Sequence, residues 1–285
     1  MSEQWVAVRE VLPAVTERFA DLVVASEPGA AATADWTVAD TAAHVVAIAS
    51  IYTTLLAPDG AEVVDPALAA RIPTVTVDTV ADLNDLALRR FRERDPAALA
   101  AALRSLVGVI VDVTARTDPA RTVPWLGASR VPVAGVLAHL VNELLIHGWD
   151  IARAVGAPWA IPPHEAGLFF DLFIVGMVRH DVGSLLDGEP PRDRRIAVAF
   201  RSRHTNPVTL VLHRGRVSVE EPGGPVDVRL GFDPAALHLV LFGRVSRTRA
   251  ALAGKLRVTG RRPWLLPAFL RAVRMPTNSV PLSGY

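Results

Sequence analysis

The chain has 285 residues, of which 51% are hydrophobic and 21% charged, a balance typical of a globular protein and not of a disordered one. It contains no cysteine, which excludes a disulfide scaffold, thiolate metal ligands and a cysteine nucleophile. Neither a signal peptide nor a long uninterrupted apolar run is evident, so we expect a cytoplasmic protein with no membrane partner.

The net charge of +1 conceals a division of the chain. Residues 192–285 carry 17 basic and five acidic side chains, while residues 1–191 carry an acidic excess. Turn-forming residues mark the boundary, at Gly156–Pro163 and again at Asp187–Pro191. We therefore predict domains at 1–157 and 192–285 with complementary surfaces, joined by a linker and connecting helix at 158–191.

The first domain is expected to be a bundle of helices. Apolar residues recur at helical spacing from Trp5 to Leu22, and Pro13 should kink this first helix or start it late. Thr37 and Asp40 form a capping-box pattern at the start of a second helix. Three more helices are predicted near 80–92, 96–115 and 132–154, the last two opened by Asp95-Pro96 and by Pro132.

The second domain changes to the alternation of β-strands. The runs RRIAVAF, PVTLVLHRGRVSVEE and VDVRLGF predict strands, with Arg214-Gly215 as a hairpin turn. Asp233-Pro234 opens a helix, LRVTG indicates a further strand, and PWLLPAFLRAV a closing helix. The fold class is therefore α plus α+β, a helical bundle followed by a smaller α+β domain.

One helix carries a stripe of ionisable side chains. Within VLAHLVNELLIHGWDIARA, the side chains of His139, Glu143, His147 and Asp150 are three or four residues apart, and most other positions are apolar. Burying such groups costs several kcal/mol each unless they are paired or bind a metal. Two imidazoles and a carboxylate suit a divalent metal.

A metal held by Glu143 and His147 needs a ligand from another helix, and His44 is the candidate. Asp150 would then orient an imidazole. The alternatives are that Glu143 and His147 form a solvated ion pair and that His44 is a partly buried polar group. His139 is open between a ligand, a hydrogen-bond partner and a surface residue.

The segments TVADTAAHVVAIASIY, which follows Trp36, and NELLIHGWDIARAVG resemble the two signatures of the mycothiol-dependent maleylpyruvate isomerase family. The likeness covers about residues 5–157 and implies a DinB-like four-helix bundle with His44, Glu143 and His147 as metal ligands. Residues 192–285 resemble the sterol-carrier-like C-terminal domain of the same family, through LFGRV with Arg244 and through LAGKLRVTGRRPWLLPAF.

The resemblance implies an enzyme that uses mycothiol as a cosubstrate, since a metal holds a thiolate at neutral pH and the chain itself has no thiol. The reaction would be an isomerisation of the maleylpyruvate type or a thiol S-transfer on a small-molecule substrate. Zinc is the favoured metal, with nickel or iron(II) also compatible. Arg244 and Asp150 are the catalytic candidates. Arg244 would either clamp a carboxylate of an acidic substrate or complement its helix C-terminus.

Two other functions remain open from the sequence. The second domain could bind a lipid or another apolar ligand, with a structural metal site and no catalysis. Nucleic-acid binding through the basic domain is disfavoured, because its arginines are not interleaved with exposed aromatic residues and no helix-turn-helix or zinc-finger spacing is present. The sequence leaves the substrate and the oligomeric state undetermined.

Overall fold

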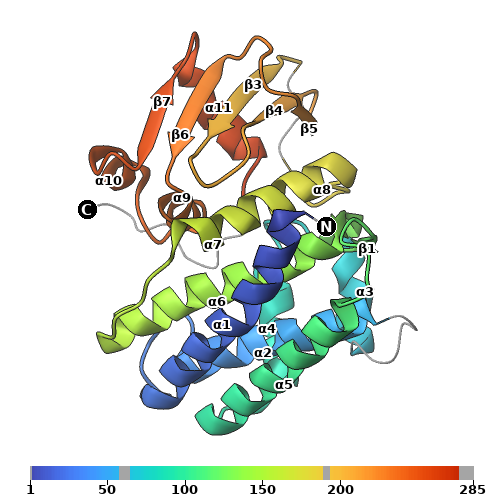
Figure 1. The fold of residues 1–285 in the computed structure, drawn as a ribbon, viewed down its shortest axis with the longest axis vertical. Coiled ribbons are helices and arrows are strands. Elements are labelled where there is room, and N and C mark those ends of the chain that lie inside the picture. Colours follow the sequence, from blue (N-terminus) through green and yellow to red (C-terminus); the bar gives the residue numbers. More distant parts are fainter. Residues whose placement is uncertain (1, 58–64, 189–192, 276–285) are drawn as a thin grey trace.

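The computed structural model describes residues 2–57, 65–188 and 193–275, and it has two layers of different architecture (Figure 1). A helical bundle lies below a small sheet that is backed by helices. This confirms the predicted fold class, a helical domain followed by a smaller α+β domain. The long helices of the bundle are α1 (Glu3–Ala25), α2 (Val38–Leu56), α5 (Pro96–Thr114) and α6 (Val133–Val155).

The helix starts follow the local capping signals. The Thr37 hydroxyl accepts from the Asp40 backbone N–H and the Asp40 carboxylate accepts from that of Thr37, which confirms the capping box of α2. The Asp95 carboxylate caps α5 in the same way. The expectation that Pro13 delays the first helix was wrong, because α1 begins at Glu3 and continues through the proline.

Several short elements pack beside α2 in the bundle. The sequence predicted α4 (Val80–Arg90) but missed several of these elements, which are too short for a periodic signal. The missed ones are α3 (Pro66–Arg71), η1 (Ile72–Thr74), η2 (Leu126–Ala128) and the hairpin β1 (Thr122–Pro124) and β2 (Arg130–Pro132).

A continuous helical segment connects the layers and contributes to both cores. It consists of α7 (Pro163–Leu168), the π-helical turn η3 (Phe169–Ile174) and α8 (Val175–His180). Phe169 and Phe173 pack in the core of the bundle, whereas Phe170 packs in the core of the sheet domain. Of the predicted boundary, residues 189–191 lie outside the described residues.

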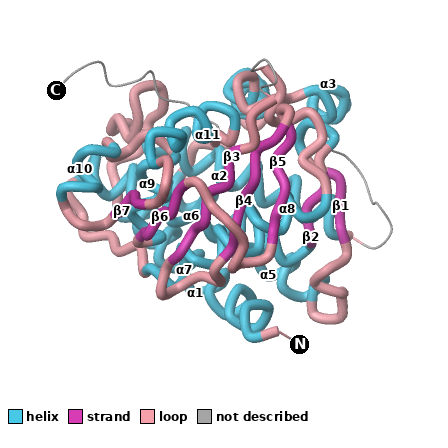
Figure 2. The backbone as a smooth tube through the Cα atoms, turned by 90° about the horizontal axis from the view of Figure 1, so that it is seen from above, coloured by secondary structure: helices cyan, strands magenta, loops and turns pink. Residues whose placement is uncertain are grey.

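The second domain is built on a five-stranded sheet in the order β5-β4-β3-β6-β7, seen from above in Figure 2. Arg214 and Gly215 have φ angles of 51° and 76°, as the predicted tight hairpin between β4 and β5 requires. β3 and β6 are parallel and the other pairs antiparallel. The elements are β3 (Ile196–Arg201), β4 (Val208–His213), β5 (Arg216–Glu220), β6 (Val228–Phe232), α9 (Pro234–Leu241), α10 (Arg247–Leu252), β7 (Leu256–Thr259), η4 (Pro263–Leu265) and α11 (Leu266–Ala272).

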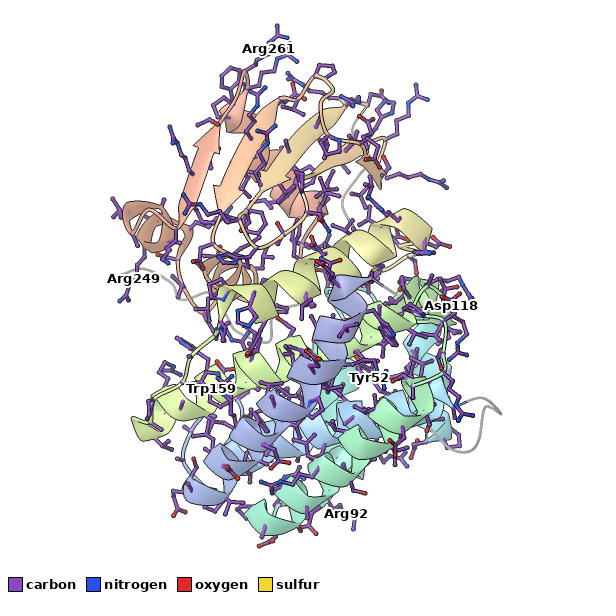
Figure 3. The ribbon with its side chains drawn as sticks, viewed as in Figure 1. Tyr52, Arg92, Asp118, Trp159, Arg249 and Arg261 are labelled. Atoms are coloured by element: carbon purple, nitrogen blue, oxygen red, sulfur yellow. The ribbon has the colours of Figure 1, made fainter. Side chains whose placement is uncertain are left out.

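The basic character of the second domain lies largely on its outside. Figure 3 shows Arg261 at the end of the second domain that lies farthest from the bundle, and Arg249 of α10 is also exposed. Two of its other arginines instead reach acidic residues of the first domain, Arg244 to Asp150 and Arg274 to Asp78. In both ion pairs the second domain supplies the positive charge and the first domain the negative charge, in line with the charge division of the sequence.

Two helices of the bundle, α2 and α5, are long and apolar enough to cross a membrane by length and composition alone. Both lie in the bundle, with 61% of the α2 window and 33% of the α5 window buried. Helices that form the core of a water-soluble bundle meet the same criteria.

A buried histidine lies where α9 meets the connecting helix. His238 is fully buried, and its ring centroid is 4.9 Å from that of Phe169. Within residues 2–57, 65–188 and 193–275, neither of its ring nitrogens has a hydrogen-bond partner. Burial lowers the pKa of His238 to about 3. Because the unfolded chain binds a proton here below about pH 6.5 and the folded chain does not, stability is lost as the pH falls below that value.

Replacing His238 with phenylalanine is therefore expected to flatten the acid side of the stability profile. His238 should account for a loss of about 2 kcal/mol in the free energy of unfolding between about pH 6.5 and pH 5. Denaturant titrations at several pH values measure the loss in the wild type and in His238→Phe. The exposed His213, changed to phenylalanine, is the control. Equal pH slopes in wild type and His238→Phe would contradict the assignment.

Candidate functional site

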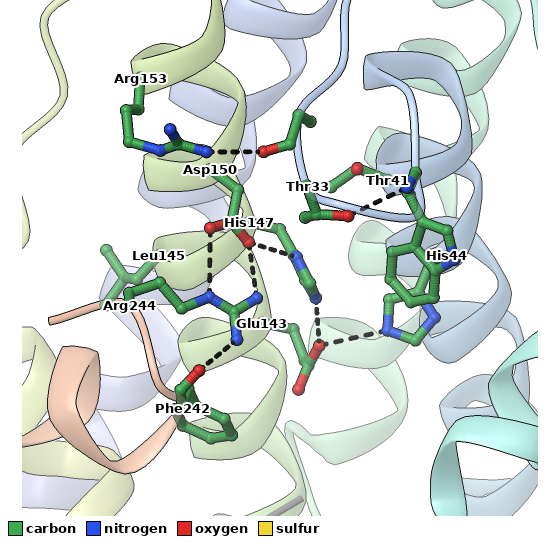
Figure 4. Close-up of polar contacts among 12 residues, drawn as sticks. Thr33, Thr41, His44, Glu143, Leu145, His147, Asp150, Arg153, Phe242 and Arg244 are labelled. Atoms are coloured by element: carbon green, nitrogen blue, oxygen red, sulfur yellow. Dashed lines mark hydrogen bonds and ion pairs between the residues drawn. The ribbon is translucent and has the colours of Figure 1, made fainter. Parts of the chain in front are cut away.

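The three predicted ligands meet between α2 and α6, as Figure 4 shows. His44 comes from the middle of α2, and Glu143 and His147 lie one turn apart on α6. The Nε2 atoms of His44 and His147 are 3.5 and 3.2 Å from the same Glu143 carboxylate oxygen. One ligand atom from each residue can be chosen so that all three lie within 4.8 Å of one another. Each side chain is at most 12% exposed.

Burial and pairing set the charges of this cluster. Burial lowers the pKa of His44, which keeps its imidazole neutral. Burial alone would raise the pKa of Glu143, but hydrogen bonds from His147 and His44 outweigh it and hold this pKa well below its usual value. The cluster therefore contains an ionised carboxylate and a neutral imidazole, both in the form that binds a cation.

The ring nitrogen of His147 that faces away from Glu143 contacts Asp150. The distance from His147 Nδ1 to Asp150 Oδ2 is 3.2 Å, a contact through which Asp150 can orient the imidazole. Hydrogen bonds to Asp150 and Glu143 raise the pKa of His147 against the lowering effect of burial. A proton on this imidazole is thus held between two carboxylates, and a cation at Nε2 would replace it on the Glu143 side.

Arg244 reaches the site from the second domain, just beyond α9. Its Nε and Nη2 donate to the two oxygens of Asp150 at 3.1 and 2.7 Å, and its Nη1 donates to the Phe242 carbonyl at 2.7 Å. The bidentate geometry expected toward a substrate carboxylate is therefore made with Asp150 of the chain itself. The Phe242 carbonyl that Arg244 contacts lies one residue beyond the end of α9. This contact resembles the alternative interpretation, in which Arg244 complements the C-terminus of its helix.

His139 is a hydrogen-bond partner in this structure. Its Nδ1 is 2.8 Å from the Tyr52 hydroxyl, and its Nε2 is 3.5 Å from the Glu143 oxygen that faces away from His44 and His147. Burial raises the pKa of Tyr52 well above its usual value, so the hydroxyl keeps its proton. Tyr52 was not predicted from the sequence, although its spacing of eight residues from His44 places both on one face of α2.

Trp36 also belongs to the site. Its ring centroid lies 4.7 Å from that of His44 and 6.0 Å from that of His147, so the indole covers both imidazoles. In the sequence this tryptophan served only as a mark of the family resemblance. Its contact with His147 depends on the loop before α2 and could not be derived from spacing.

Comparison with known protein families identifies both halves of the chain. Residues 9–152 match the family described as the mycothiol maleylpyruvate isomerase N-terminal domain. The chain belongs to this family. Residues 193–262 match the SCP-2 sterol transfer family. Both matches confirm the resemblance seen in the sequence, and the described architecture agrees with them. A search of curated proteins found no match.

Solved structures show the same fold as this member of the maleylpyruvate isomerase family. The crystal structure of a mycothiol-dependent maleylpyruvate isomerase is 14% identical, with a TM-score of 0.53, and the match covers 91% of this chain and 96% of that one. An alanine mutant of a mycothiol-dependent maleylpyruvate isomerase matches with the same identity, TM-score and coverage. At this identity the likeness establishes the fold.

The residues present in this family member fit a divalent metal. Two imidazole nitrogens and one carboxylate oxygen converge on one point, and His147 has the outer carboxylate partner that commonly fixes a ligating histidine. Three protein ligands leave at least one position for an exogenous group, as in catalytic rather than structural sites.

A cavity of about 470 Å³ opens onto this cluster. His44, Glu143 and His147 line one part of it, together with Arg244. Most of its other lining residues are aliphatic or aromatic, and α2 and α4 contribute the largest groups of them. The candidate metal centre therefore faces a partly open cavity of the size that small-molecule ligands occupy.

Proposed function

We propose that this protein is a metal-dependent enzyme that uses mycothiol as its cosubstrate. The observation that carries the proposal is the convergence of His44, Glu143 and His147 at the wall of a ligand-sized cavity, in a chain of this family. A divalent ion bound there would lower the pKa of a thiol and so supply a thiolate nucleophile at neutral pH. Zinc suits these ligands best.

Two reactions are compatible with this chemistry. In an isomerase of the maleylpyruvate type, the thiolate adds to an activated double bond, the resulting single bond rotates, and the thiolate is expelled unchanged. In a thiol S-transferase, the new carbon–sulfur bond is retained and the neighbouring carbon takes a proton. Only the second reaction consumes the thiol.

The chain's own residues would orient and shield these groups. Asp150 holds the His147 ring through Nδ1 and is itself held by Arg244, so the imidazole has one fixed orientation. Trp36 covers both imidazoles on one side. The apolar walls of the cavity exclude water, which strengthens electrostatic interactions inside it.

The test measures turnover of the metal-loaded protein with maleylpyruvate, and with other activated alkenes, in the presence and absence of mycothiol. We expect turnover only with the thiol present. One mole of thiol consumed per mole of product would indicate an S-transferase, and no net consumption an isomerase. Metal-loaded protein that turns over none of these substrates, but copurifies with a lipid, would instead support the ligand-binding alternative.

A further inference from the structure

The arginines that line the cavity beside the candidate metal centre are paired with carboxylates of the chain itself. Its lining includes two arginines, and each already has a carboxylate partner in the described part of the chain. Arg244 is paired with Asp150, and its Nη1 donates to a backbone carbonyl. Arg274 is paired with Asp78 and donates to the Leu186 carbonyl. A substrate carboxylate entering the cavity would therefore meet cations that are neutralised, and would lose its hydration without full compensation.

The far part of the cavity is hydrocarbon. Leu68, Val80 and Leu83 form a small buried cluster at α3 and α4, and Met177 and Val178 face the cavity from α8. Such a surface favours the burial of an apolar group by about 25 cal/mol per Å² of area removed from water. It offers few hydrogen bonds to the hydroxyls of a sugar or to a second carboxylate, since Asn84 is the polar side chain that α4 contributes to the described lining.

One neutral polar group near the metal ligands has unused bonding capacity. Asn142 lines the cavity, is 1% exposed, and its amide oxygen has no hydrogen-bond partner among the described residues. This oxygen is an acceptor, so a water or another hydrogen-bond donor is needed to satisfy it.

We propose that the electrophile bound at this site is an uncharged molecule with a hydrocarbon body and one polar group beside its reacting carbon. An α,β-unsaturated aldehyde or ketone with an alkyl chain has this chemistry. The inference deepens the proposed function, on which it rests, and replaces the expectation of an acidic substrate. The reacting carbon lies beside the centre, and the alkyl chain occupies the space toward α3 and α4.

Binding is tested first without turnover, using methyl octanoate and octanoate, which differ in charge and not in chain length. Trp125 lines the cavity and is buried, so intrinsic fluorescence can report occupancy. We expect the ester to bind at least about tenfold more tightly, a difference of about 1.4 kcal/mol. Equal binding of the two, or tighter binding of the carboxylate, would overturn the inference.

A variant that fills the cavity locates the binding. Ala87 of α4 lines the cavity, whereas Ala81 on the same helix does not. Ala87→Phe is expected to weaken ester binding by about tenfold, and Ala81→Phe to leave it unchanged. Thermal unfolding of both variants checks that they are folded. Unchanged ester binding in folded Ala87→Phe would place the ligand elsewhere and so reject the inference.

Turnover is compared for trans-2-octenal and 8-oxo-oct-6-enoate, two enals in which a terminal methyl group is exchanged for a carboxylate. With mycothiol, sulfur bonds to the β-carbon and a proton goes to the α-carbon. We expect kcat/KM to be at least about tenfold higher for the uncharged enal. If neither enal reacts while the binding results hold, the proposed function fails and the apolar specificity stands. If only the charged enal reacts, the specificity is wrong and thiol chemistry stands.

Discussion

Replacing Arg244 with alanine should lower the free energy of unfolding by about 3 to 5 kcal/mol, because it leaves a buried carboxylate without its partner. Asp150 has 3% of its side chain exposed and Arg244 has 10%, so water cannot replace the lost contacts. The pair also joins α6 of the bundle to the segment that follows α9 in the second domain. Chemical denaturation of the two proteins measures the difference.

A second variant distinguishes the effect of the unpaired Asp150 charge from the loss of the packing of the Arg244 side chain. Arg244→Ala combined with Asp150→Asn removes both charges, so most of the lost stability should return, while the new amide at position 150 would still accept a hydrogen bond from His147. Arg249 is exposed, and its change to alanine should be close to neutral. An Arg244→Ala protein as stable as the wild type would show that Asp150 finds another partner.

Replacing Glu143 with alanine should abolish stoichiometric metal binding. The wild type is expected to hold about one divalent ion per chain. Loss of the carboxylate leaves two neutral imidazoles, so the affinity should fall by roughly a hundredfold or more. Asp150→Asn changes the partner of His147 and of Arg244 but no ligand, and it should weaken binding by about tenfold to a hundredfold. Elemental analysis after dialysis, and competition with a chelator, measure both effects.

The matched control for Glu143→Ala is Glu10→Ala, which removes an exposed carboxylate from α1. It should bind metal as the wild type does. Circular dichroism checks that Glu143→Ala is folded, because this change also removes a buried partner of both histidines. Metal content in folded Glu143→Ala equal to that of the control would remove Glu143 from the ligand set.

The arrangement also bears on how the two domains depend on each other. His147 is oriented by Asp150, and Asp150 is held by Arg244 from the second domain. Phe169 and Phe173 pack against the ring of His139 from the connecting helix. The second domain therefore supports the candidate metal centre, in addition to any ligand that it binds itself.

Local signals in the sequence determined the longer helices and the strands of the second domain. The capping residues Thr37, Asp95 and Asp233 act on backbone groups within three positions, so their effect needs no knowledge of the fold. The helical repeat placed His139, Glu143 and His147 on one face of α6 for the same reason. Its period does not say which other helix that face meets.

The tertiary structure alone decided what surrounds that face. It brought His44 to 3.5 Å from Glu143 across about a hundred residues of chain, directed Arg244 to Asp150, and placed Asn142 at the wall of an apolar cavity. These contacts depend on how elements that are distant in the chain pack together in the folded core. The spacing of residues along one helix does not determine that packing.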